Sequence, residues 1–210
     1  MILQKKEIEQ LESRYRATFI NSLAGYRQAV LIGSKSLDGK SNVSIFNSLI
    51  HLGANPALWG FICRPDTVQR DTLRNILETN SYTFNYVQTN DFEKAHQTSA
   101  KYETAVSEFD AVGFTEQIIE PIHAPFVQEA VVKIGMQLSE KIDIKLNGTI
   151  LVIGSIEYIE LNENCIGKDG FVGLEKENIL GCVGLDAYYS PQFLGRLSYA
   201  KPEKWTTRIQ

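Results

Sequence analysis

The sequence predicts a mainly β protein: an antiparallel β-barrel decorated by a few helices, built as a single domain of 210 residues. Two observations support this prediction. Short segments rich in β-branched and aromatic residues are separated by turn dipeptides such as Asp38-Gly39 and Asn147-Gly148. Regular strand–helix alternation is missing, and neither GxGxxG nor GxxxxGK[ST] occurs. A Rossmann or P-loop sheet is therefore not expected.

The composition is that of an ordinary globular protein, with 43% hydrophobic and 22% charged residues. A net charge of −4 with scattered Lys and Arg argues against nucleic-acid binding. An odd number of cysteines without a CxxC motif argues against a disulfide framework and predicts a reducing cytoplasm; they are Cys63, Cys165 and Cys182. The histidines are too far apart for a zinc site, so no metal is expected; they are His51, His96 and His123.

The N-terminal segment, residues 1–20, contains no apolar run long enough for a signal peptide or a membrane span. Its apolar residues recur at helical spacing; they are Ile8, Leu11, Tyr15 and Phe19. We therefore expect an amphipathic helix that covers one flank of the core.

The next segments read as neighbouring antiparallel strands. Residues 28–33 form the first, and the Asp38-Gly39 hairpin turn follows because Gly accepts a positive φ. Residues 42–50 form the second strand. Asn55-Pro56 marks a turn before the third strand, residues 57–63. Together they predict a meander.

The chain then changes character. Residues 71–79 predict a helix with Leu73, Ile76 and Leu77 on one face. The aromatic and β-branched residues of 81–87 predict a strand. Residues 91–101 predict a short helix in which Asp91 is the candidate N-cap.

A long hairpin is predicted in the second half. Apolar and other residues alternate with period two over residues 132–139, which indicates a half-buried strand. The turn Asn147-Gly148 leads into a second strand, residues 149–159, rich in Ile and Val. The tail, residues 185–210, is aromatic and irregular.

The stretch NVSIFNSLI, residues 42–50, carries four small polar side chains on a predicted strand. Alternation places Asn42, Ser44, Phe46 and Ser48 on one face and Val43, Ile45, Asn47 and Leu49 on the other. Small hydroxyl and amide groups let a flat ligand approach the backbone while they bond its polar edge. The alternative is a solvated strand face, on which Ser and Asn are common.

A second polar cluster precedes and opens the predicted helix 71–79. A helix start with free N–H groups, together with nearby arginine and threonine side chains, makes a phosphate site; the candidates are Arg64, Thr67, Arg70 and Thr72. Asp71 opposes an anion unless Arg70 or Arg74 offsets its charge. The alternative is simple capping by Asp71 or Thr72, with the arginines on the surface.

Two further residues carry weaker signals. His123 is either a proton donor near a reacting ring or a loop histidine without a catalytic duty. Cys63 either lines a pocket at the end of a strand or is a small buried hydrophobe.

The order of these segments resembles the flavin reductase-like family of FMN-binding split β-barrel proteins. The likeness runs from about Gly25 to Ile159 and rests mainly on NVSIFNS (42–48) and RDTLRNI (70–76). Supporting pieces are the Asp-Gly turn, Cys-Arg-Pro (63–65), YTFNYV (82–87) and Ser-Glu-Phe-Asp (107–110). The family often shows A-x-S-F-S-S on the first stretch, where this chain has Asn47 in place of a hydroxyl-bearing residue and Ile45 in place of a small one.

The resemblance implies an FMN-binding split barrel that forms a homodimer, with FMN near the subunit interface. The strand from Asn42 to Ser48 would line the isoalloxazine and ribityl chain. Val43 and Ile45 would act mainly through backbone groups, and Ser44, Asn47 and Ser48 through side chains. Cys63 and Arg64 would lie by the ring and phosphate. Arg70, Asp71 and Thr72 would hold the phosphate.

The implied function is that of an NAD(P)H-dependent flavin reductase, in which FMN is reduced by NADH or NADPH and passes electrons on. The alternative is an FMN-binding electron-transfer or sensor protein without its own NAD(P)H activity. A third reading is a barrel that has lost flavin and binds something else.

Overall fold

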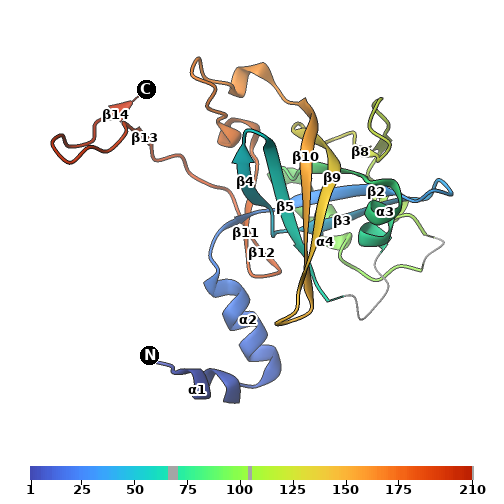
Figure 1. The fold of residues 1–210 in the computed structure, drawn as a ribbon, viewed down its shortest axis with the longest axis horizontal. Coiled ribbons are helices and arrows are strands. Elements are labelled where there is room, and N and C mark those ends of the chain that lie inside the picture. The colour runs from blue at the N-terminus through green and yellow to red at the C-terminus, as the bar shows by residue number, and fades with distance from the viewer. Residues whose placement is uncertain (66–70, 104–105, 210) are drawn as a thin grey trace.

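The centre of the molecule is a seven-stranded antiparallel sheet in the order β3-β2-β6-β9-β10-β5-β4 (Figure 1). This computed structural model describes residues 1–65, 71–103 and 106–209. The strands are β2 (Val30–Lys35), β3 (Ser41–Phe46), β4 (Ile50–Ala54), β5 (Ala57–Cys63), β6 (Ser81–Tyr86), β9 (Lys133–Ile144) and β10 (Thr149–Glu160). The sheet curls around a core but is not closed, because no pairing joins its edge strands β3 and β4 within the described residues. This is the predicted split barrel with helices around it.

Turn chemistry produces the hairpins that the sequence predicts. Between β2 and β3 the Ser36 N–H donates to the Lys40 carbonyl at 2.9 Å, and Gly39 takes a φ of +86°. Gly148, with a φ of +73°, closes the turn between β9 and β10 in the same way. A residue with a side chain is strained at such angles, so glycine is needed at both positions.

The predicted meander is wrong in one respect. β2 pairs with β3, and β4 pairs with β5, but β3 and β4 lie at opposite edges of the sheet. The strand that starts at Ser41 ends at Phe46, and residues 47–49 carry the chain across the split to β4. Two short strands replace the single one expected over 42–50. The sheet curls, and the chain must cross the split between β3 and β4.

Two apolar clusters pack against the two faces of the sheet. The larger fills the inside of the barrel, and its main members are Ile32, Phe61, Tyr82, Phe84, Met136 and Val152. The second packs the outer face of β2 and β3 against α4 (Phe92–Gln97), α5 (Glu108–Val112) and β11 (Gly181–Val183); its members include Leu31, Val43, Ala95, Phe109 and Leu180. The predicted apolar face of β9 is confirmed, because Val132, Ile134 and Met136 all belong to the larger cluster. The strand is not half-buried over this stretch, however, because Lys133 and Gly135 on the other face are buried as well.

The helix α3 (Asp71–Thr79) has the predicted bounds and packs on the sheet through Leu73 and Ile76, which are buried. α4 is shorter than expected, and Asp91 precedes it without a side-chain capping bond. Shorter elements complete the fold: β1 (Arg27–Gln28), η1 (Thr89–Asp91), β7 (Glu116–Gln117), β8 (Phe126–Val127), η2 (Glu163–Cys165), η3 (Leu174–Glu177), β12 (Ala187–Tyr189), β13 (Arg196–Leu197) and β14 (Arg208–Ile209).

Both chain ends project from the barrel (Figure 1). The N-terminal segment forms two helices, α1 (Lys5–Gln10) and α2 (Ser13–Leu23), and neither contains a buried residue. The prediction that this segment covers a flank of the core is therefore wrong. Its apolar spacing is real, but the barrel is already covered by its own elements, and the helices lie beside it.

Candidate functional site

The two polar segments singled out in the sequence meet at one place. The Asn42 side-chain amide on β3 lies 2.9 Å from Thr72 Oγ1 in the first turn of α3, and both residues are buried. β3 is held by its hairpin with β2, and α3 lies across β2, so the start of the helix reaches the start of the strand. The strand and the helix entrance therefore form one continuous polar surface.

The alternation predicted for residues 42–50 holds only within β3, which ends at Phe46. Phe46 packs into the barrel against Phe61, with ring centroids 5.1 Å apart, whereas Val43 and Ile45 belong to the outer cluster. Beyond Phe46 the rule fails: Leu49 was expected on the Val43 face but packs against the barrel core. The strand ends at Phe46, so its period of two no longer applies.

Two of the predicted site side chains make bonds within the chain. Ser48 Oγ donates to the Ile62 carbonyl at 3.0 Å and accepts from the Ile62 N–H at 3.1 Å, so it continues the pairing with β5. Asn47 Nδ2 donates to the Gly184 carbonyl at 2.6 Å and fixes the segment near β11. Both residues lie beside the split between β3 and β4.

The free edge of β3 is covered by side chains from outside the sheet. The Ile45 N–H donates to Thr98 Oγ1 at 2.9 Å. With the Asn42 amide oxygen turned toward Thr72, the amide nitrogen lies 3.2 and 3.3 Å from the two Glu108 carboxylate oxygens. Thr98 follows α4 and Glu108 begins α5, so these helices satisfy donors that an open sheet edge would leave free.

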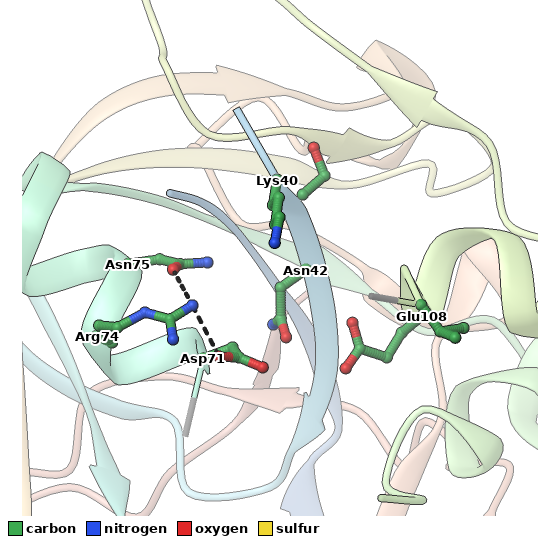
Figure 2. Close-up of a pocket in the computed structure, with 8 residues that line it drawn as sticks. Lys40, Asn42, Asp71, Arg74, Asn75 and Glu108 are labelled. Atoms are coloured by element: carbon green, nitrogen blue, oxygen red, sulfur yellow. Dashed lines mark hydrogen bonds and ion pairs between the residues drawn. The ribbon is translucent and has the colours of Figure 1, made fainter. Parts of the chain in front are cut away.

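A small pocket opens at the junction of β3, α3 and α5 (Figure 2). Figure 2 shows the Lys40 ammonium and the side chains of Asn42, Asn75 and Glu108 directed toward it. The lining residues are Lys40, Ser41, Asn42, Asp71, Arg74, Asn75, Val106 and Glu108. The pocket is thus strongly polar, with two cations and two carboxylates around neutral amides.

The charged side chains of this pocket differ in whether they are paired with an opposite charge. Arg74 Nη2 lies 2.8 Å from Asp71 Oδ1, so the aspartate at the helix start is offset as the sequence required. Burial, and to a smaller extent the charge of Asp71, raises the pKa of Glu108 above its usual value. Lys40 has no carboxylate within ion-pair distance among the described residues. One ammonium therefore remains available to an anion.

Other predicted site residues lie around the end of β5. Cys63 is buried, with 1% of its surface exposed, and Arg64 directly after it is exposed. Arg70 and Thr67 lie outside the described residues. The structure therefore brings Asn42, Asp71 and Thr72 together and leaves the role of Arg70 a prediction.

The residues of the site that escaped the sequence prediction include Lys40, Asn75, Thr98 and Glu108. Lys40 follows a hairpin turn, where a lysine is ordinary. The Ser-Glu-Phe-Asp stretch was noted only for its resemblance, although a Ser before a helical acidic residue is a recognisable helix start. Nothing local in Thr98 indicates that it bonds a strand 53 residues away.

His123 is exposed in the loop between β7 and β8. The three cysteines are buried. Within residues 1–65, 71–103 and 106–209, no cluster of His, Cys, Asp and Glu is suited to a metal ion. In the same part of the chain, no helix has the length and apolar character needed to span a membrane.

Comparison with known proteins agrees with this architecture. The family described as "Flavin reductase like domain" matches residues 25–172. The crystal structure of a proposed flavin reductase with a split barrel domain from Shewanella frigidimarina NCIMB 400 is 44% identical, covers 95% of this chain and 100% of its own, and has a TM-score of 0.92. An uncharacterized protein from Aquifex aeolicus (strain VF5) is 24% identical over 164 residues, 77% of this chain and 82% of the relative.

More distant structures share the fold. Nitrilotriacetate monooxygenase component B from Bacillus cereus has a TM-score of 0.82 at 17% identity, with 94% of this chain and 98% of that chain covered. The 2-nitrobenzoate 2-nitroreductase NbaA of Pseudomonas fluorescens has a TM-score of 0.81 at 21% identity, covering 98% and 99%. The extent of the family match and the 44% identity lead to one conclusion. This chain belongs to the flavin reductase-like family.

Proposed function

We propose that the protein is an FMN-binding flavoprotein that acts as an NAD(P)H-dependent flavin reductase-type oxidoreductase. The observation that carries this proposal is the contact between Asn42 and Thr72, which joins the polar strand β3 to the start of α3. Family membership and the 44% identical protein described as a proposed flavin reductase support the flavin part.

The groups at this surface suit a molecule that is planar at one end and anionic at the other. Ser44 is half-buried on β3, and no described residue hydrogen-bonds to its hydroxyl, so that hydroxyl is open to a ligand. Arg64 is exposed and Lys40 faces the pocket, and each offers a cation to a phosphate. These donors fit FMN, whose phosphate needs cations and whose ring edge needs neutral hydrogen-bonding groups.

In this assignment each segment has a definite task. Asn42 and Ser44 face the flavin from β3, while Thr72 and the N–H groups of the first turn of α3 face the phosphate. Arg74 neutralises Asp71, which would otherwise repel that phosphate. Asn47 and Ser48 lie beside the split and bond Gly184 and Ile62, and these bonds keep the end of β3 in place.

The bound flavin supplies the redox chemistry, taking up a hydride and releasing electrons to an acceptor. The chain's own contribution is binding and electrostatics. Hydrogen-bond donors at the pyrimidine edge stabilise the negative charge of a reduced flavin and raise its reduction potential. Two further features belong to the proposal: a homodimer with FMN near its interface, and a reducing, cytoplasmic location in keeping with an odd number of cysteines and no CxxC motif.

The first experiment is a visible absorption spectrum of the purified protein, before and after heat release of any cofactor, followed by FMN titration. Anaerobic stopped-flow mixing with NADH and with NADPH then measures bleaching of the bound flavin. We expect FMN binding and bleaching faster than that of free FMN. Binding without reduction above the free-FMN background would instead favour the electron-transfer or sensor function. A colourless protein that ignores FMN would refute both.

A mutational test addresses the helix start. Replacing Arg70 and Thr72 together by alanine should weaken FMN binding about tenfold or more, because one charge-assisted hydrogen bond is worth roughly 1.5–3 kcal/mol. Thr18→Ala is the matched control, since Thr18 is exposed on α2. Unchanged affinity in a folded double variant would show that the helix start is only a cap.

A further inference from the structure

Glu108 is a carboxylate without a cation of its own in the pocket between β3, α3 and α5 (Figure 2). It lies in the first turn of α5 and is half-buried. With the Asn42 amide oxygen turned toward Thr72, the neutral Asn42 amide nitrogen lies 3.2 and 3.3 Å from the two Glu108 oxygens. Among residues 1–65, 71–103 and 106–209, no basic side chain lies within ion-pair distance of Glu108. An ionised Glu108 therefore has no opposite charge directly beside it.

The two cations of the pocket differ in how far their charge is compensated. Arg74 is shared by two carboxylates, because its Nη2 lies 2.8 Å from Asp71 Oδ1 and its Nε 3.9 Å from Glu78 Oε1. Lys40 has no such partner in the described part of the chain. Lys40 is therefore the pocket cation that an entering phosphate meets unpaired, and an ionised Glu108 would offset its charge.

The elements that surround Glu108 supply no other partner. β3, against which α5 packs, carries only neutral side chains. On α4, Lys94 Nζ donates to the Gly113 carbonyl at 3.3 Å, and His96 Nδ1 lies 2.8 Å from the Tyr188 hydroxyl. The charged and titratable residues of α3, α4, α5 and the β2–β3 turn are Asp38, Lys40, Asp71, Arg74, Glu78, Glu93, Lys94, His96 and Asp110.

Protonation changes what Glu108 can offer to an anion. An ionised carboxylate only accepts hydrogen bonds, whereas the neutral acid also has an O–H that donates. The oxygens of a phosphate are acceptors, so they are repelled by the first form and bonded by the second. Burial, and to a smaller extent the charge of Asp71, already raises the pKa of Glu108. A dianionic phosphate beside Glu108 would act in the same direction as Asp71.

We propose that Glu108 takes up a proton when the pocket binds the FMN phosphate, and that its neutral acid donates a hydrogen bond to a phosphate oxygen. The inference rests on the proposed flavin function and gives that phosphate a further partner besides Lys40 and Thr72. The proton comes from solvent and returns to it when FMN leaves, so only an O–H bond forms and breaks. Flavin affinity is thereby coupled to pH.

The direction of this coupling follows from linkage. Because FMN binding adds a proton to Glu108, affinity falls as the pH rises from the pKa of Glu108 in the free protein to its pKa in the complex. Each pH unit in this interval lowers the affinity by up to about tenfold. The phosphate itself acts in the opposite direction, since a monoester has a second pKa of about 6 and a cation favours the dianion. A variant without the Glu108 proton separates the two effects.

The test is FMN titration between about pH 5 and about pH 8, followed by quenching of flavin fluorescence. The proteins are the original chain, Glu108→Gln and the matched control Glu129→Gln, whose carboxylate accepts the Thr115 N–H in an exposed position. The ratio of the dissociation constant of the original protein to that of Glu108→Gln should rise about tenfold over this range. The ratio to Glu129→Gln should stay constant. With riboflavin, which has no phosphate, both ratios should stay constant.

The possible failures can be told apart. A ratio for Glu108→Gln that does not change with pH, or that changes equally for riboflavin, would overturn the inference while FMN binding persists. FMN that binds none of the three proteins at any pH would refute the proposed function, and the inference with it.

Carbon-13 NMR of the original protein gives a readout that needs no variant. The Glu108 carboxyl signal, assigned through its own side-chain carbons, should titrate at a higher pH with saturating FMN than without it. A midpoint that is unchanged or lower would contradict proton uptake. This measurement decides the question even where Glu108→Gln does not fold.

Discussion

Asn42 and Thr72 are separated by 30 residues in the sequence, yet their side chains lie 2.9 Å apart in a buried contact. The Asn42 amide also faces the Glu108 carboxylate, so a single side chain links β3 to two helices. The position of the α3 start relative to the polar strand depends on this link. The same contact is therefore open to a test of stability and a test of ligand binding.

The first prediction concerns this pair. Asn42→Ala and Thr72→Val should each destabilise the protein, and the double variant should lose about 1 kcal/mol less than the sum of the single changes, the net worth of one hydrogen bond. Urea unfolding of the four proteins measures this coupling. Additive effects would show that the contact contributes nothing of its own.

The second prediction concerns pH. Burial raises the pKa of Glu108, so ionisation of this group is less favourable in the folded than in the unfolded state. Its contribution to stability is complete below the ordinary glutamate pKa of about 4.3 and is lost as the pH rises through the higher folded value. Glu108→Gln keeps an acceptor oxygen for Asn42 but removes the charge.

We therefore expect Glu108→Gln to melt at a higher temperature than the original protein near pH 7, and the difference to vanish near the ordinary glutamate pKa. Thermal unfolding monitored by circular dichroism over this pH range measures both melting temperatures. Glu129→Gln is the control, because its carboxylate accepts the Thr115 N–H in an exposed position. A difference that stays constant with pH would exclude titration of Glu108 as its cause.

The third prediction concerns the buried cation of β9. Lys133 has a side chain that is 5% exposed, and its Nζ lies 2.9 Å from Glu160 Oε1, which also lowers the pKa of Glu160. Glu160→Ala should destabilise by about 2–3 kcal/mol, because it leaves a buried charge unpaired. Adding Lys133→Met should recover most of that loss in urea unfolding. No recovery would mean that packing, and not the charge, sets the cost.

The fourth prediction concerns the covered edge of β3. Thr98 Oγ1 accepts from the Ile45 N–H at 2.9 Å and donates to the Ala95 carbonyl at 2.7 Å. Thr98→Val keeps the shape but removes both bonds, and should cost about 1–3 kcal/mol. It should also speed hydrogen exchange at the Ile45 amide, whereas Thr98→Ser should preserve both properties. Unchanged exchange in the valine variant would contradict the role assigned to Thr98.

Several features of the fold could be predicted because they depend on a few adjacent residues. The glycines at positions 39 and 148 specify two hairpins by their positive φ, and alternation in β9 specifies which side chains enter the barrel. Such local rules fail beyond Phe46, the last residue of β3. The period-two rule assigned Leu49 to the wrong cluster, because nothing in the neighbouring letters shows that the strand ends there.

By itself the sequence determined the class of fold, the bounds of β5, α3, β6 and β10 to within about a residue, and the two polar segments around Asn42 and Thr72. Only the tertiary structure decided that these segments touch, that Glu108 and Thr98 cover the edge of β3, and that Lys40 faces the pocket. Turn and alternation signals act over a few residues. Contacts between residues 30 or 53 positions apart depend instead on how far the sheet curls before it splits, which is set by the packing of the whole core.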